Sequence, residues 1–145
     1  DRIHIPNGLA KDVQAECLAY DEDIANAGRL DLQLLGLGAN GHIGFNEPAE
    51  SFSLETNCVD LTESTINANK RFFASYDDVP KQAYTMGIQS IMMAKKVVVV
   101  VSGADKADIV AKAFTGPVTP QVPASILQMH PNVIVVVDEA AGSLI

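Results

Sequence analysis

The sequence predicts an α/β fold built on an open, parallel-type sheet with flanking helices, and three observations predict it. First, apolar runs at residues 32–37, 96–102 and 132–137 have the length and composition of strands buried in a parallel sheet. Second, segments with helical spacing separate these runs, as expected when parallel strands are joined by crossover helices. Third, a glycine-rich turn follows the first run, where open α/β sheets usually bind ligands.

The first half of the chain shows strand and helix signals in turn. Residues 2–6 alternate polar and apolar side chains before a Pro-Asn-Gly turn, so we expect a strand there. Residues 10–27 place apolar side chains at helical spacing, and Gly28 ends the predicted helix. Beyond the run at 32–37, residues 55–61 indicate a strand, and Thr62 caps a short predicted helix through residue 69.

The second half continues the alternation. Residues 83–88 indicate a strand that leads into a short helical segment ending near residue 95. Residues 96–102 predict a buried strand, and Gly103 precedes a predicted helix at 105–114. A loop with one glycine and two prolines follows, Pro123 opens a helix ending near residue 129, and residues 132–137 form the last predicted strand.

Composition restricts the class of protein. The chain has 145 residues, 48% of them hydrophobic and 19% charged, which is typical of one soluble globular domain. The net charge of −8 and the lack of a basic run make nucleic acid an unexpected partner. The apolar runs are too short to span a membrane. Two cysteines, Cys17 and Cys58, have no disulfide or metal-site spacing, so we expect a reduced, cytoplasmic setting.

The glycines after the first apolar run match a nucleotide-binding pattern that we do not favour. Gly36, Gly38 and Gly41 have the G-x-G-x-x-G spacing of dinucleotide-binding folds. That fingerprint needs a helix that opens at the third glycine and points its N-terminus at the pyrophosphate. Gly44 and Pro48 would break such a helix early, so the match is weak.

The same stretch contains a histidine and a carboxylate suited to acid–base chemistry. His42 titrates near neutrality, so it can exchange protons with a substrate, and Glu47 can orient it and stabilise its charged form. A lone histidine is more often structural, but this one follows a glycine turn at a predicted ligand-binding edge. The histidines and cysteines of the chain lack ligand spacing, so no metal site is expected.

The full string from Gly36 to Pro48 is G-x-G-x-N-G-H-I-G-F-N-E-P, and it resembles the signature of the glucosamine-6-phosphate deaminase family. Further matching segments are Asn7-Gly8, Arg71-Phe72-Phe73, Val79-Pro80-Lys81 and His130-Pro131. The resemblance implies a Rossmann-like sugar-phosphate isomerase fold. It also implies conversion of glucosamine 6-phosphate and water to fructose 6-phosphate and ammonia, through ring opening, aldose–ketose isomerisation and deamination, without a cofactor.

The resemblance also implies roles for individual residues. The implied catalytic group is His42 as the acid/base for ring opening, Glu47 as its partner, and Asn40 beside them; the implied substrate-binding group is Arg71, Lys106, Gly38 and Gly41. Arg71 and Lys106 correspond to the phosphate ligands of the family. Family members carry Asp or Asn at position 40. An Asn can form hydrogen bonds but cannot take up the proton, which must therefore move through His42.

The resemblance leaves one catalytic group unaccounted for. The family's isomerisation base is an aspartate in a segment that precedes the part matched here, as does a phosphate-binding loop. We therefore expect residues 1–145 to form a single α/β domain that is the C-terminal portion of a larger catalytic domain, without its N-terminal part, and to be inactive alone.

Three other functions stay open at this point. A galactosamine-6-phosphate deaminase/isomerase would differ only in the substrate epimer. 6-Phosphogluconolactonases share the fold and a Gly-His turn but lack the continuation from Phe45 to Pro48, so they rank lower. A non-catalytic sugar-phosphate sensor would not need the pair formed by His42 and Glu47, because binding alone requires no acid/base.

Overall fold

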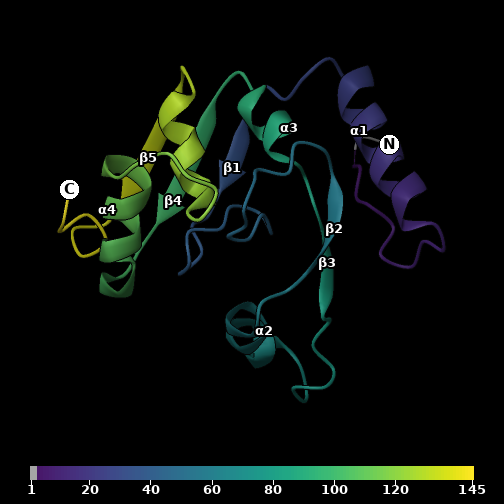
Figure 1. Ribbon diagram of the computed structural model, residues 1–145, viewed down its shortest axis with the longest axis horizontal. Coiled ribbons are helices and arrows are strands. Elements are labelled where there is room, and N and C mark those ends of the chain that lie inside the picture. Colours follow the sequence, from purple (N-terminus) through teal and green to yellow (C-terminus); the bar gives the residue numbers. More distant parts are fainter. Residues whose placement is uncertain (1–2) are drawn as a thin grey trace.

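A computed structural model describes residues 3–145, and its centre is a parallel three-stranded sheet (Figure 1). The strands lie in the order β1 (Gln33–Leu35), β4 (Val97–Val101) and β5 (Val133–Val137). Both β1 and β5 pair with β4 in parallel, and Val97 is aligned with Gln33 on one side and with Val133 on the other. The parallel sheet predicted from the three apolar runs is therefore confirmed.

Helical segments connect and cover the strands. The α-helices are α1 (Val13–Asn26), α2 (Glu63–Asn69), α3 (Ile88–Met92) and α4 (Ala107–Thr115). The 3-10 helices are η1 (Lys70–Phe72), η2 (Ala104–Lys106) and η3 (Pro123–Met129). Thr62 accepts a hydrogen bond from the backbone N–H of Thr65 and caps α2, which confirms its predicted role.

Two further strands form an antiparallel ribbon separate from the parallel sheet. β2 (Asn57–Asp60) pairs with β3 (Gln82–Thr85), and the segment between them contains α2 and η1. Figure 1 shows this segment, residues 57–85, leaving the parallel sheet as an arm that carries α2 at its far end. Both strands were predicted, but they pair with each other in antiparallel fashion and do not join the parallel sheet.

The hydrophobic core lies on one face of the parallel sheet. Val97, Val99 and Val101 of β4 are almost fully buried and belong to one cluster with Val110 of α4 and Leu127 of η3. Side chains alternate between the two faces of a strand, so the intervening residues point the other way. These residues are exposed to between 45% and 64%: Leu34 is 64% exposed, Val100 49%, Ile134 45% and Val136 48%. The prediction that the apolar runs are buried on both faces is wrong for this outer face.

Two predicted boundaries also differ from the structure. Residues 3–6 form no strand, while residue 2 lies outside the described residues. His4, for which the sequence offers no evident partner, instead contacts Asp23 of α1, with 2.9 Å between Nδ1 and Oδ2. The strand predicted at 83–88 ends at Thr85, because Ile88 already begins α3. None of the helices in the described part of the chain combines the length and apolar character needed to cross a membrane.

Candidate functional site

The loop that follows β1 folds back on itself instead of opening a helix. The N–H of Gly41 donates to the carbonyl of Gly38, and the N–H of Gly38 donates to the carbonyl of His42, both at 2.9 Å. Ile43 and Asn46 then form an isolated β-bridge. Because no helix begins at Gly41, the loop lacks the helix N-terminus that a dinucleotide pyrophosphate needs, and that interpretation is excluded.

This fold brings the three predicted catalytic residues into one hydrogen-bonded network. The Asn40 amide nitrogen donates to Glu47 Oε2 at 2.6 Å, which leaves Asn40 Oδ1 facing His42 Nδ1 at 2.8 Å. His42 Nδ1 is also 3.4 Å from Glu47 Oε2. Both oxygens beside Nδ1 are acceptors, so Nδ1 carries the proton. The Nε2 atom of neutral His42 is then the acceptor that can take a proton from a bound molecule.

Burial favours the neutral form of His42. Burial lowers the pKa of His42 below its ordinary value of 6.5; the Glu47 carboxylate raises it and the Lys106 charge lowers it further. The side chain of His42 is 20% exposed and that of Glu47 is 10% exposed. An imidazole in this environment is prepared to accept a proton, and a nearby carboxylate stabilises the imidazolium that results.

Packing explains why the two positions predicted to bind substrate, 38 and 41, are both glycine. A Cβ atom added to Gly38 would lie 2.3 Å from two atoms of the His42 ring, so the ring packs directly on the Gly38 backbone. Gly41 has φ +89°, and a Cβ there would approach Cγ1 of Val122 to 2.8 Å. A side chain at position 38 would displace the His42 ring, and one at position 41 would meet both an unfavourable φ and the Val122 side chain.

Lys106 reaches this loop from the segment that follows β4. It lies at the end of η2, directly before α4, and its Nζ donates to the carbonyl of Leu37 at 2.9 Å. This contact holds the half-buried ammonium at the carboxyl end of β1, close enough to lower the pKa of His42. A cation beside the imidazole is where an anionic substrate group would be held.

Arg71 is the predicted site residue that the structure leaves apart. It lies on the exposed η1 segment of the arm, and its guanidinium stacks 4.8 Å from the centre of the Phe72 ring. Among residues 3–145 no hydrogen bond or ion pair joins it to the other predicted site residues. The neighbouring Phe72 and Phe73 are also exposed, to 68% and 41%.

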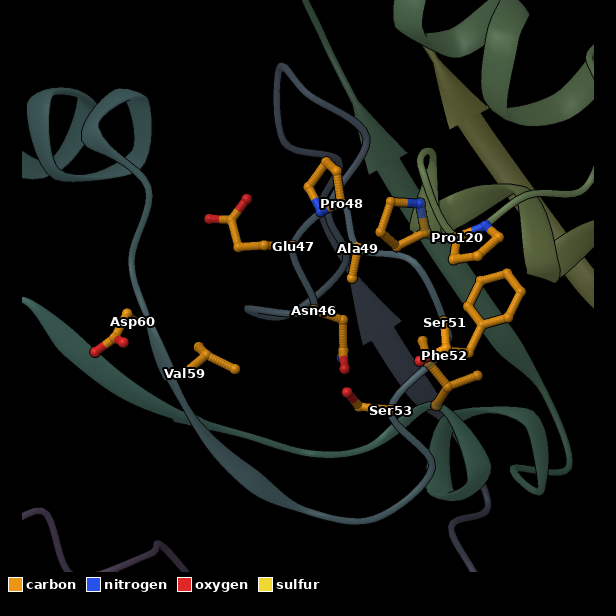
Figure 2. A pocket seen from close by; sticks show the side chains of 12 residues that line it. Asn46, Glu47, Pro48, Ala49, Ser51, Phe52, Ser53, Val59, Asp60 and Pro120 are labelled. Carbon is orange, nitrogen blue, oxygen red and sulfur yellow. The ribbon is translucent and has the colours of Figure 1, made fainter.

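A cavity of about 230 Å³ lies next to the network, between the loop after β1 and β2 (Figure 2). Glu47 and Asp60 line it, and none of its lining residues is a cation. Figure 2 shows the Glu47 carboxylate directed away from the Asn46 side chain. An anionic phosphate is therefore disfavoured in this cavity and favoured beside Lys106.

One side chain of the network was not predicted from the sequence. Thr65, in the first turn of α2, is buried, and its hydroxyl donates to Glu47 Oε1 at 2.6 Å. The only sequence feature that could have indicated Thr65 is its spacing from Thr62, and that spacing is already explained by capping of the helix. Asn46 shapes the turn, because its amide nitrogen donates to the carbonyls of Ile43 and Met86. Buried His130 is structural, with its Nε2 2.9 Å from the carbonyl oxygen of Ala94.

The sequence comparisons agree with the predicted resemblance. Residues 1–136 match the model of the family described as glucosamine-6-phosphate isomerases/6-phosphogluconolactonase. The chain is 57% identical over 141 residues to a glucosamine-6-phosphate deaminase of Clostridium perfringens (strain SM101), covering 97% of this chain and 58% of that protein. It is 53% identical over 145 residues to the deaminase of Thermoanaerobacter pseudethanolicus, covering 100% of this chain and 57% of that protein. The chain thus spans less than two thirds of these relatives' length.

Solved structures show the same relationship. A monomeric glucosamine-6-phosphate deaminase matches with a TM-score of 0.93 at 48% identity, covering 98% of this chain and 59% of that one. A 6-phosphogluconolactonase from Trypanosoma cruzi matches with a TM-score of 0.67 at 18% identity, covering 96% of this chain and 54% of that one. The second likeness concerns the fold alone, and the predicted sugar-phosphate isomerase fold is confirmed by the first.

Proposed function

This chain belongs to the family of glucosamine-6-phosphate isomerases and 6-phosphogluconolactonases, and on that premise we propose that it supplies the ring-opening site of a glucosamine-6-phosphate deaminase. In this proposal the full-length enzyme, a polypeptide of its relatives' length, converts glucosamine 6-phosphate and water to fructose 6-phosphate and ammonia. The observation that carries the proposal is the network of Asn40, His42 and Glu47, which holds a neutral imidazole with its Nε2 free to accept a proton.

Ring opening follows from this network. Nε2 of neutral His42 takes the proton of the anomeric hydroxyl and returns a proton to the ring oxygen, while the bond between C1 and that oxygen breaks and C1 becomes an aldehyde. Asn40 accepts the Nδ1 hydrogen bond and keeps the ring in the required tautomer. The Glu47 carboxylate, 3.4 Å from Nδ1, stabilises the transient imidazolium.

We propose that substrate binding uses two cations, Lys106 beside the network and Arg71 on the arm. We assign the phosphate of the sugar to Lys106, at the carboxyl end of β1, and to Arg71, whose planar fork suits phosphate oxygens. We assign backbone contacts with the sugar to Gly38 and Gly41, whose missing side chains leave room for the His42 ring and for Val122.

The later steps need a base that moves a proton between C1 and C2 of the opened sugar. We do not assign Asp21 this role, because it lies in α1 and both of its carboxylate oxygens accept hydrogen bonds from Thr56. We therefore expect the 145-residue chain alone to release no ammonia at enzymatic rates, and the full-length enzyme to do so.

The test is ammonia release by the full-length enzyme from glucosamine 6-phosphate, galactosamine 6-phosphate and unphosphorylated glucosamine, with lactone hydrolysis of 6-phosphogluconolactone in parallel. We expect release from glucosamine 6-phosphate, at rates lowered by about 100-fold or more in His42→Gln, since acid–base groups contribute 10²–10⁴-fold. His4→Gln, on an exposed histidine paired with Asp23, is the matched control and keeps full activity. Lactone hydrolysis without ammonia release refutes the proposal.

A further inference from the structure

The buried hydroxyl of Thr65 contacts the carboxylate of the proposed ring-opening network. Thr65 is 4% exposed, and its Oγ1 lies 2.6 Å from Glu47 Oε1. A carboxylate has no proton to give, so the hydroxyl is the donor. Thr62 supports it from one helical turn before, with 3.0 Å between the two hydroxyl oxygens.

The two oxygens of Glu47 have separate partners. Oε1 accepts a close hydrogen bond from Thr65 at 2.6 Å and a longer one from Thr62 at 3.5 Å, whereas Oε2 accepts from Asn40 and faces His42. The bond to Thr65 therefore fixes the rotation of the carboxylate, which determines where Oε2 points. We propose that Thr65 is a positioning residue for ring opening, and that its hydroxyl holds Glu47 in the orientation that supports His42. This inference rests on the proposed function.

A purely structural role does not account for this contact. The cap of α2 is already provided by the Thr62 side chain, so helix formation does not need the Thr65 hydroxyl. The Glu47 side chain is only 10% exposed, so water has little access to replace a lost donor. A carboxylate oxygen left without its donor in such a site turns toward other partners, and the geometry at His42 changes with it.

The direct test is Thr65→Val in the full-length enzyme, because valine keeps the branched shape and removes the hydroxyl. We expect kcat to fall about 10- to 100-fold, the loss typical when a residue that orients a functional side chain is removed. KM for glucosamine 6-phosphate should change less than about twofold, because Thr65 is not assigned a contact with the substrate. Because Glu47 raises the pKa of His42, a carboxylate turned away should also move the acid limb of the kcat profile to lower pH. Thr65→Ser keeps the hydroxyl and should restore both properties.

Thr56→Val is the matched control. Thr56 is equally buried and its hydroxyl also donates to a carboxylate, that of Asp21 at 2.5 Å, but this pair joins the residue before β2 to α1, outside the network. The Thr56→Val variant should lower the melting temperature, as we expect for Thr65→Val, but it should leave kcat and its pH profile unchanged. If Thr65→Val does not fold, Thr65→Ala serves for the same comparison.

Three results would overturn the proposal. The first is a wild-type kcat and acid limb in Thr65→Val or Thr65→Ala. The second is a kinetic loss in Thr56→Val equal to that in Thr65→Val. The third is a Thr65→Ser variant as slow as Thr65→Val. Ammonia release by the wild-type enzyme is measured first, so that a failure of the proposed function is distinguished from a failure of this inference.

Discussion

Replacing Gly38 by alanine perturbs the proposed ring-opening site through a single methyl group. The added Cβ would lie 2.3 Å from the Cε1 and Nδ1 atoms of His42 and 2.4 Å from Nε2, whereas ordinary contacts begin at 3.4 Å. The imidazole must therefore withdraw by about 1 Å. That movement is large compared with the 2.8 Å contact between Nδ1 and Asn40, which cannot survive it without a compensating shift.

The kinetic consequence follows from this displacement. Misplacement of a catalytic group by about 1 Å costs on the order of 100-fold in rate, so we expect kcat of the full-length enzyme to fall by about that factor. The added volume should also destabilise the fold by about 1–3 kcal/mol, as overpacking usually does. Steady-state ammonia release and thermal unfolding measure the two effects separately.

Gly36→Ala is the control for this experiment. Gly36 lies two residues earlier in the same loop, and a Cβ there meets no atom within 4 Å. This variant should keep kcat within about twofold, because nothing near the imidazole moves. A Gly38→Ala enzyme with wild-type turnover, or a Gly36→Ala enzyme that is equally slow, would refute the packing of His42 on Gly38 as a catalytic requirement.

The remaining predictions concern charge and exposed surface. Glu47→Gln removes the carboxylate that raises the pKa of His42, so the acid limb of kcat/KM should move to lower pH; an unchanged limb would contradict the pairing. Lys106→Ala should weaken binding of glucosamine 6-phosphate by about 2–5 kcal/mol and leave unphosphorylated glucosamine unaffected, by calorimetry; equal losses for both sugars would show a structural role. The exposed apolar face of the sheet should make the 145-residue chain self-associate, and Leu34→Lys with Ile134→Lys should reduce its light scattering by placing charges there; undiminished scattering would contradict association through this face.

Local sequence signals predicted the parallel sheet because the apolar strands are long enough to be recognised without tertiary information. Val97 to Val101 is such a run, and its pairing on both sides follows from the alternation with helices. The exposure of Val100 and Ile134 was not predictable in the same way, because an unbroken apolar run conceals which face the helices cover.

The site was predictable where its residues share one loop. Asn40, His42 and Glu47 lie within eight consecutive positions, so a tight turn is enough to bring them together. Thr65 was missed because its partner lies 18 positions away on the arm, whose antiparallel pairing no local pattern specified. A Thr-x-x-Thr pair before a helix satisfies the capping rule by itself and gives no sign of a second contact.

The most direct test of the ring-opening claim is the exchange between the α and β anomers of glucosamine 6-phosphate, measured by NMR magnetisation transfer. Exchange requires the ring to open and close but needs no isomerisation base. The account predicts that the full-length enzyme accelerates this exchange and that His42→Gln abolishes the acceleration, while Lys106 and Arg71 still hold the phosphate. Acceleration by the His42→Gln enzyme equal to that of the wild type would contradict the account.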